Sequence, residues 1–101
     1  MRECVFIDGI RTANARAHKE KGWFRKVRPD QLLTSVYDAL FQRNPKVKPE
    51  DVEGVFVGCA NLSGMQNDIG RLAWLAGGYP DSVPTQSVCN QCPSGMTATM
   101  N

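Results

Sequence analysis

Apolar positions along the chain gather in three short runs that have the character of β-strands. Residues 4–10 read CVFIDGI, a run rich in β-branched and aromatic types, which predicts a buried strand. A second run at about 53–59 and a third at 85–89, TQSVC, predict two further strands. Because these runs are apolar with little alternation, they suit a sheet that is covered by helices.

The stretches between the runs have the spacing of helices. From Pro29 to Asn44 one apolar stripe recurs at helical intervals, formed by Leu32, Leu33, Val36, Tyr37, Leu40 and Phe41. Pro29 suits the first turn of this helix, and the Asn-Pro pair at its end stops it. A second helix is predicted over about 66–76, and a third begins near Pro93.

The predicted order is therefore β-α-β-α-β-α, an α/β fold whose helices cover a mixed sheet. Parallel neighbours joined by right-handed crossovers are expected. Residues 11–28 are polar and cationic and suit a surface loop that the pair Trp23–Phe24 anchors to the body. The helix after Cys92 has barely begun at Asn101, so we expect residues 1–101 to be one piece of a truncated domain.

Composition narrows the classes of function. The chain has 101 residues, 42% of them hydrophobic and 22% charged, with a net charge of +2. So small a charge does not favour a nucleic-acid partner, and no apolar run approaches the roughly 20 residues of a membrane span. The N-terminus lacks a secretory pattern, so a cytoplasmic, reducing location is expected. There the four cysteines should be thiols, namely Cys4, Cys59, Cys89 and Cys92.

The segment SVCNQCPSGMTA, residues 87–98, holds the candidate nucleophile. If the third strand ends near Asn90, Cys92 lies at a helix N-terminus, where unpaired N–H groups and the helix dipole favour a thiolate. Pro93 is tolerated in that first turn, and Gly95 permits a close approach by another backbone or by a ligand. This arrangement suits acyl transfer through Cys92, with nearby N–H groups stabilising an oxyanion. In the alternative, Cys92 is a small, buried, inert residue of a non-catalytic α/β scaffold.

The pair Cys89 and Cys92 also has the C-x-x-C spacing of zinc sites and thiol–disulfide centres. No metal site is expected, because zinc needs four ligands and the other candidates are scattered, at Cys4, Cys59 and His18. Redox pairs usually open the helix after a first strand, and this pair follows the third. Strand alternation turns Cys89 away from the face of its neighbours, so we expect it to be a packing or supporting residue. A small thiol–disulfide module remains an alternative.

Four stretches of the chain resemble the thiolases in order and spacing. VPTQSVCNQCPSGMTA is similar to the family's nucleophile segment, in which a Val-Pro strand leads to Cys-x-Ser-Gly. VFIDGIRT resembles its first strand and Arg-Thr turn, and GWFRKVRPDQLL resembles the loop that enters its first helix. GMQNDIGRLAWLAGGYPDSVP resembles the helix that leads to the cysteine strand. The resemblance extends over nearly the whole chain, because the four stretches are spread from residue 5 to residue 98.

The resemblance implies a 3-ketoacyl-CoA thiolase, an acetyl-CoA acyltransferase of fatty-acid β-oxidation. Such an enzyme transfers acyl groups between 3-oxoacyl-CoA and coenzyme A, by thiolysis or by the reverse Claisen condensation. Cys92 would attack the 3-keto carbonyl and carry the acyl group as a thioester. Acyl-CoA and coenzyme A are then substrates, and no bound cofactor is implied. The family also implies a homo-oligomer, a dimer with the cysteine strand near its interface, or a subunit of a fatty-acid oxidation complex.

The chain departs from the family at two positions and lacks part of its machinery. Cys89 stands where the family usually has Asn, and Pro93 where it has a small residue. The histidines and second cysteine of thiolases come later in the sequence, and the chain's one histidine, His18, is expected to be solvated. Residues 1–101 alone are therefore expected to be inactive. The cationic run around His18 has the composition to attract coenzyme phosphates, but a solvated face is the commoner explanation.

Overall fold

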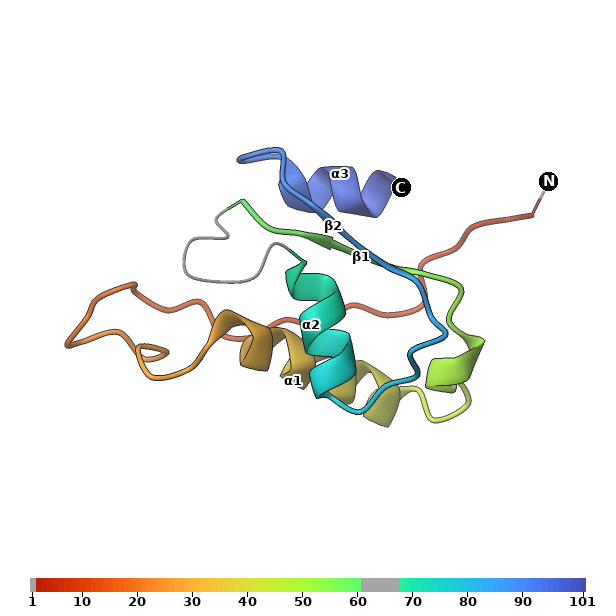
Figure 1. The fold of residues 1–101 in the computed structure, drawn as a ribbon, viewed down its shortest axis with the longest axis horizontal. Coiled ribbons are helices and arrows are strands. Elements are labelled where there is room, and N and C mark those ends of the chain that lie inside the picture. Colours follow the sequence, from red (N-terminus) through yellow and green to blue (C-terminus); the bar gives the residue numbers. More distant parts are fainter. Residues whose placement is uncertain (1, 61–67) are drawn as a thin grey trace.

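The computed structural model describes residues 2–60 and 68–101. Its elements follow the order α1 (Pro29–Arg43), η1 (Pro49–Asp51), β1 (Val55–Gly58), α2 (Ile69–Ala76), β2 (Thr85–Val88) and α3 (Ser94–Met100). They form layers: α3 lies on one face of the two strands, and α2 lies on the other face with α1 packed against it (Figure 1). None of the described helices has the length and apolar character that crossing a membrane requires.

The two strands are parallel neighbours, as the β-α-β order predicts. Val55 pairs with Thr85, and Gly58 pairs with Val88. The Cys59 N–H donates to the Val88 carbonyl at 2.9 Å, so the strands stay together to the end of β2. The predicted second and third strands are thus confirmed, and both carboxyl ends meet at one edge of the sheet.

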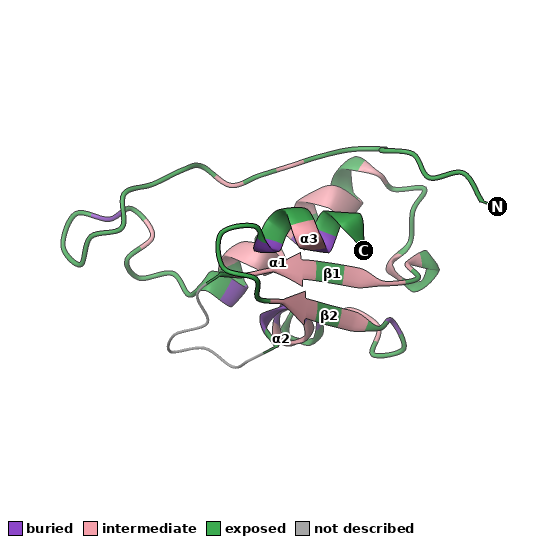
Figure 2. Ribbon diagram, turned by 90° about the horizontal axis from the view of Figure 1, so that it is seen from above, coloured by how far each residue is buried: buried purple, intermediate pink, exposed green. Residues whose placement is uncertain are grey.

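The core forms where α1, α2 and the loop that leads into β2 meet. Its buried members are Tyr37, Ala73, Trp74 and Val83. Trp74 is 1% exposed and stacks on Tyr79 with 4.6 Å between the ring centroids. Its indole N–H donates to the Pro80 carbonyl at 2.6 Å, so this large apolar ring is buried without an unsatisfied donor. Figure 2 shows that burial concentrates around α2 and under α3.

Polar side chains fix where the two longer helices begin. At the start of α1, the Arg28 N–H donates to the Gln31 side chain at 3.0 Å, and Pro29 occupies the first turn as predicted. At the start of α2, the Asp68 carboxylate accepts from the Arg71 N–H at 3.2 Å and from the Ser87 hydroxyl at 2.7 Å. This cap therefore also joins α2 to β2. The first two positions of the predicted helix, 66 and 67, lie outside the described residues.

The prediction of a strand at residues 4–10 is wrong. This segment has no strand hydrogen bonds, and Phe6 is 93% exposed. Polar contacts hold the segment instead. An Arg2–Glu53 ion pair at 2.9 Å lies just before it, and Asp8 within it contacts the end of α1. The pattern is right for a strand, but a strand also needs a neighbour for its N–H and C=O groups, and none of the described strands lies beside it. The described sheet is thus two-stranded and parallel, and not mixed.

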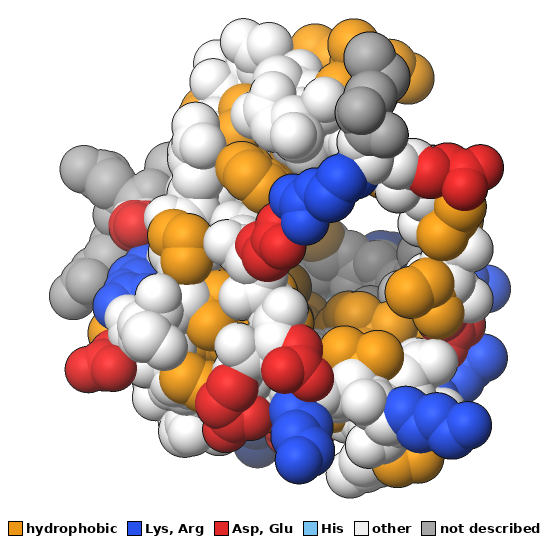
Figure 3. All heavy atoms as spheres, turned by 90° about the vertical axis from the view of Figure 1, so that its right-hand side faces the viewer, with side chains coloured by type: hydrophobic (Ala, Val, Ile, Leu, Met, Phe, Trp, Pro, Cys, Tyr) orange, Lys and Arg blue, Asp and Glu red, His pale blue; other side chains and the backbone are white. Residues whose placement is uncertain are grey.

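An open cleft separates residues 4–10 from the body. Its volume is about 450 Å³, and its lining comes from that segment, α1 and β1, including Phe6, Ile7, Tyr37, Phe41, Val55 and Trp74. Figure 3 views the end of the molecule where hydrophobic side chains surround this hollow. The segment therefore runs past the apolar face of the body without packing tightly onto it.

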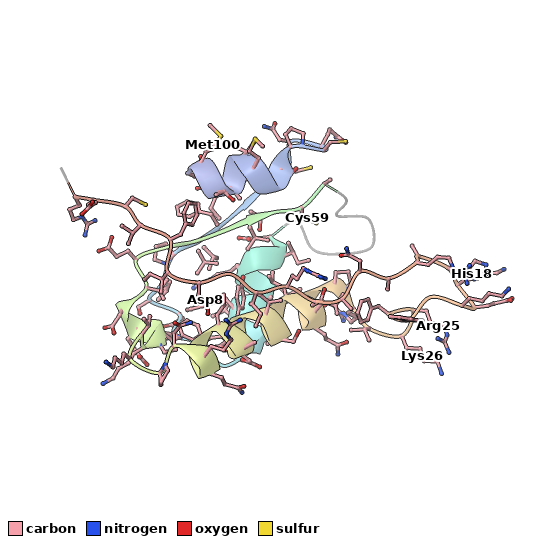
Figure 4. The ribbon with its side chains drawn as sticks, turned by 180° about the vertical axis from the view of Figure 1, so that it is seen from behind. Asp8, His18, Arg25, Lys26, Cys59 and Met100 are labelled. Atoms are coloured by element: carbon pink, nitrogen blue, oxygen red, sulfur yellow. The ribbon has the colours of Figure 1, made fainter. Side chains whose placement is uncertain are left out.

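The cationic stretch is a surface loop, as predicted, but Trp23 does not anchor it. Trp23 is 74% exposed, and only Phe24 is partly buried. Backbone hydrogen bonds give the loop its shape instead, including Gly22 N–H to the His18 carbonyl at 2.9 Å. Figure 4 places His18, Arg25 and Lys26 at the outer end of this loop.

Candidate active site

The candidate nucleophile lies on the turn between β2 and α3. Strand β2 ends at Val88, the chain bends at Gln91, and Pro93 is the residue that precedes α3. Cys92 is exposed on this turn, at the place that the sequence predicts. The alternative in which Cys92 is a buried apolar residue is therefore wrong.

Gln91 gives the turn its sharpness. Its φ is 59°, and among the residues that the structure describes no other non-glycine residue has a left-handed backbone. Such a conformation costs a non-glycine residue of the order of 1 kcal/mol and persists only where surrounding contacts hold it. The contacts that hold it come from the residue that begins α3.

Ser94 locks the turn through its hydroxyl. The side chain is 2% exposed, and its Oγ donates to the Gln91 carbonyl at 2.7 Å and accepts from the Asn90 N–H at 2.7 Å. The Ser94 N–H donates to the same Gln91 carbonyl at 3.2 Å. One buried hydroxyl, from a residue that follows Cys92, thus satisfies two backbone groups that precede it.

A second set of hydrogen bonds ties the turn to the body of α3. The Asn90 side-chain amide donates to the Thr97 hydroxyl at 3.2 Å, and that hydroxyl donates to the Pro93 carbonyl at 3.1 Å. The strand side of the turn is thereby connected to the next turn of the helix. Cys92 lies between two fixed points.

Gly58 explains how closely α3 lies to the sheet. A Cβ at this position would come within 2.3 Å of the Ser94 carbonyl carbon and oxygen and 2.5 Å of the Gly95 nitrogen. These are backbone atoms, so a side chain here would displace the start of α3. The hydrophobic pattern predicts only that Gly58 lies in a strand, although a glycine at a strand end can mark such an approach.

The prediction that Cys89 is a packing residue is wrong, and the alternative that it supports the site stays a prediction. Cys89 is exposed, and its Sγ lies 3.8 Å from the Ala60 carbonyl oxygen, a weak contact for a thiol donor. The prediction extended strand alternation to Cys89, but β2 ends one residue earlier, at Val88. Beyond that point alternation no longer decides where a side chain lies.

His18 is a solvated loop residue, as expected. Its Nδ1 accepts from the backbone N–H groups of Glu20 at 3.1 Å and Lys21 at 3.0 Å, so the imidazole stabilises the turn over residues 18–21. Figure 4 shows it at the outer end of the loop, away from α3. The histidine therefore does not meet Cys92.

The remaining cysteines do not build a metal centre with the candidate site. Over residues 2–60 and 68–101, no group of three His, Cys, Asp or Glu side chains is placed to hold a metal ion. In the same ranges no disulfide joins the four cysteines. Cys4 is exposed in the N-terminal segment, and Cys59 follows β1 beside the end of β2.

Comparison with known proteins identifies related sequences over almost the whole chain. The family model described as the N-terminal domain of thiolase matches residues 4–101. A 3-ketoacyl-CoA thiolase of Chromohalobacter salexigens is 41% identical over 98 residues, which are 96% of this chain and 24% of that protein. A 3-oxoadipyl-CoA/3-oxo-5,6-dehydrosuberyl-CoA thiolase of Escherichia coli is 37% identical over 99 residues, which are 97% of this chain and 24% of that protein.

A solved structure agrees with these sequences. The crystal structure of the Bacillus anthracis acetyl-CoA acetyltransferase superposes with a TM-score of 0.68 at 34% sequence identity, covering 78% of this chain and 20% of that one. The chain thus spans about a quarter of the length of the curated relatives it matches. The partial α/β architecture is shared with that enzyme.

Proposed function

Since this chain belongs to the thiolase family, we propose that Cys92 is the nucleophile of an enzyme that transfers acyl groups between 3-oxoacyl-CoA and coenzyme A. Residues 1–101 are then the N-terminal part of that enzyme's N-terminal domain. Acyl-CoA and coenzyme A are its substrates, with no bound cofactor. We place the enzyme in the cytoplasm, in fatty-acid β-oxidation, as a dimer or as a subunit of an oxidation complex.

The position of Cys92 carries this proposal. Its side chain is exposed on a turn whose two sides are fixed by the buried hydroxyl of Ser94. A nucleophile must meet a carbonyl carbon in a defined geometry, and a fixed, accessible turn provides this. The thiol also lies two residues before α3, and backbone N–H groups at a helix start are able to stabilise an oxyanion that forms beside them.

In the degradative direction the reaction has two steps. The Cys92 sulfur adds to the C3 carbonyl of 3-oxoacyl-CoA, and the bond between C2 and C3 then breaks. Acetyl-CoA leaves as its enolate and takes up a proton, while the shortened acyl group stays on Cys92 as a thioester. The thiol of coenzyme A attacks this thioester, a new acyl-CoA leaves, and the Cys92 sulfur is regenerated.

Proton transfer in these steps needs groups that the described residues, 2–60 and 68–101, do not bring together. The sulfur must lose a proton before attack, and the enolate must gain one. His18, the chain's single histidine, is occupied in its own loop. We therefore assign the acid and base to parts of the enzyme outside this chain, and we expect residues 1–101 alone not to turn over.

Trapping the acyl-enzyme tests the proposal. The enzyme that contains this chain is mixed with isotopically labelled acetyl-CoA, quenched in acid and digested, and the labelled peptide is sequenced by mass spectrometry. The label should lie on Cys92. Cys92→Ser should lower kcat for thiolysis by about 10³-fold or more, because an alcohol is a far weaker nucleophile than a thiol.

The matched control is Cys4→Ser, which alters another exposed thiol that lies outside the turn. This variant should retain the activity of the parent enzyme. Label on a residue other than Cys92, or a Cys92→Ser variant that is as active as the parent, would refute the assignment.

A further inference from the structure

We propose that Cys89 and Cys92 form a reversible disulfide, which removes the Cys92 sulfur from acyl transfer when peroxide is present. The disulfide itself depends only on the two thiols. Its effect on acyl transfer rests on the proposed function of Cys92. Cys89 then has a role of its own, as the thiol that resolves an oxidised Cys92.

Accessibility is the first support. Both side chains are exposed, and both belong to the short connection between β2 and α3. Oxidation of cysteine is selective for thiols that solvent can reach. Cys89 is exposed, and its weak contact with the Ala60 carbonyl leaves its side chain able to change rotamer at little cost.

The backbone between the two thiols is the second support. Cys89 and Cys92 are the first and fourth residues of a four-residue stretch, and Gln91, the third, has a φ of 59°. Gln91 bends the chain between the two thiols, and cysteines separated by two residues have the spacing of thiol–disulfide centres. A disulfide requires Cα atoms no more than about 7 Å apart, a separation that a bent four-residue stretch permits. The bend at Gln91 thus favours a bridge across the turn.

The reaction balances with hydrogen peroxide as the oxidant. The Cys92 thiolate attacks one peroxide oxygen, the O–O bond breaks, and Cys92 becomes a sulfenic acid as hydroxide leaves. The Cys89 thiol then attacks the Cys92 sulfur, the S–S bond forms, the S–O bond breaks, and water leaves. A dithiol reductant returns two electrons and two protons and restores both thiols. The bridge also protects Cys92, because a sulfenic acid without a resolving thiol goes on to sulfinic acid.

Cys59 is the competing partner. Its N–H donates to the Val88 carbonyl, so it follows β1 at the level where Cys89 follows β2. Cys59 is only partly accessible, whereas Cys89 and Cys92 are exposed. Oxidation should therefore begin at the turn and close there.

Mass spectrometry of the enzyme that contains this chain tests the inference. The enzyme is treated with hydrogen peroxide, blocked with an alkylating reagent and cleaved with trypsin. No Lys or Arg follows Arg71 within this chain, so one peptide carries both thiols. That peptide should lose two hydrogens and resist alkylation, and dithiothreitol should restore both alkylation and thiolysis.

The variants separate a resolving thiol from a bystander. In Cys89→Ser, Cys92 should proceed to sulfinic acid, and the thiolysis that dithiothreitol recovers after peroxide should fall about tenfold relative to the parent enzyme. Cys59→Ser, the matched control, should recover as the parent does. A bridge between Cys59 and Cys89, or equal recovery with and without Cys89, would overturn the inference.

Failure of the two proposals can be told apart. If the bridge forms but no acyl group is trapped on Cys92, the disulfide stands and the proposed function fails. If an acyl group is trapped on Cys92 but peroxide leaves both thiols free to alkylate, the function stands and this inference fails.

Discussion

Two apolar runs of similar composition adopt different structures in this molecule. Residues 4–10 and β1 both combine valine, phenylalanine and a neighbouring glycine, yet only β1 is a strand. β1 has β2 beside it and helices on both faces. Residues 4–10 have no strand neighbour among the described elements, and their large side chains stay exposed. The comparison shows that an apolar pattern makes a segment able to form a strand, and that a neighbouring strand is needed for the strand to form.

The largest change in stability is expected when an aromatic residue of the packed core is substituted and compared with one in residues 4–10. Trp74→Ala should lower the free energy of unfolding by about 3–5 kcal/mol, because Trp74 is 1% exposed and its loss leaves a large cavity beside Tyr79. Phe6→Ala should change it by less than about 0.5 kcal/mol, since Phe6 is 93% exposed. Urea unfolding of the enzyme that contains this chain measures both.

A Phe6→Ala variant that loses as much stability as Trp74→Ala would contradict the comparison. It would mean that residues 4–10 are buried in the assembled enzyme. The cleft of about 450 Å³ between that segment and α1 is the space in which such burial would occur.

A smaller effect is expected from adding one methyl group to a glycine in each region. Gly58→Ala should cost about 1–3 kcal/mol, because the new Cβ would meet backbone atoms of Ser94 that no rotamer change can move. It should also slow acyl transfer at Cys92, since displacing Ser94 would disturb the hydroxyl that holds the turn. Gly9→Ala is the matched control: a Cβ at Gly9 would have no atom within 4 Å, so stability should be nearly unchanged.

Unfolding midpoints and the rate of Cys92 alkylation by iodoacetamide measure these two effects. Equal results for the two variants would show that α3 is free to shift away from β1. The close approach of Gly58 to Ser94 would then not be what holds the turn.

Much of the fold could be predicted from the sequence because most of its signals are local. The stripe from Leu32 to Phe41 and the Pro29 start define α1, and the apolar centres of β1 and β2 define the parallel pair. What failed depends on contacts between distant segments. The pattern at residues 4–10 cannot show that no strand lies beside it, and Trp23 in a cationic loop cannot show which surface it would pack against.

The candidate site divides in the same way. The position of Cys92 follows from a strand end, a proline and a helix start, all within a few residues. The Gly58–Ser94 approach joins residues on different elements, so sequence reasoning missed it. Cys89 was misplaced for a third reason, because its orientation depends on whether β2 ends at Val88 or one residue later. A one-residue difference in a strand boundary therefore changes the role assigned to a thiol.

The smallest expected effect concerns Asp8, whose polar contacts join residues 4–10 to the end of α1. The Asn44 side-chain amide donates to the Asp8 carboxylate at 3.0 Å, the Gly9 N–H donates to it at 2.8 Å, and Arg43 lies 3.1 Å away. These contacts favour the charged form, so they lower the pKa of Asp8, with Asn44 the main cause. A lowered pKa means that these contacts stabilise the molecule above the ordinary aspartate value of about 3.9 and are lost as pH falls through the folded value.

The Gly9 amide reports this titration directly, because its N–H is bonded to the Asp8 carboxylate. Its NMR chemical shift should change with a midpoint below about pH 3.9, and Asn44→Ala should move that midpoint upward. Added salt should weaken the share that comes from Arg43 but leave the Asn44 share in place, since screening acts on charge pairs more than on hydrogen bonds. A midpoint at the ordinary aspartate value, unchanged in Asn44→Ala, would mean that residues 4–10 are not held at the end of α1. In that case the segment's position would depend wholly on the apolar cleft, and the difference between the two regions would lie in their packing alone.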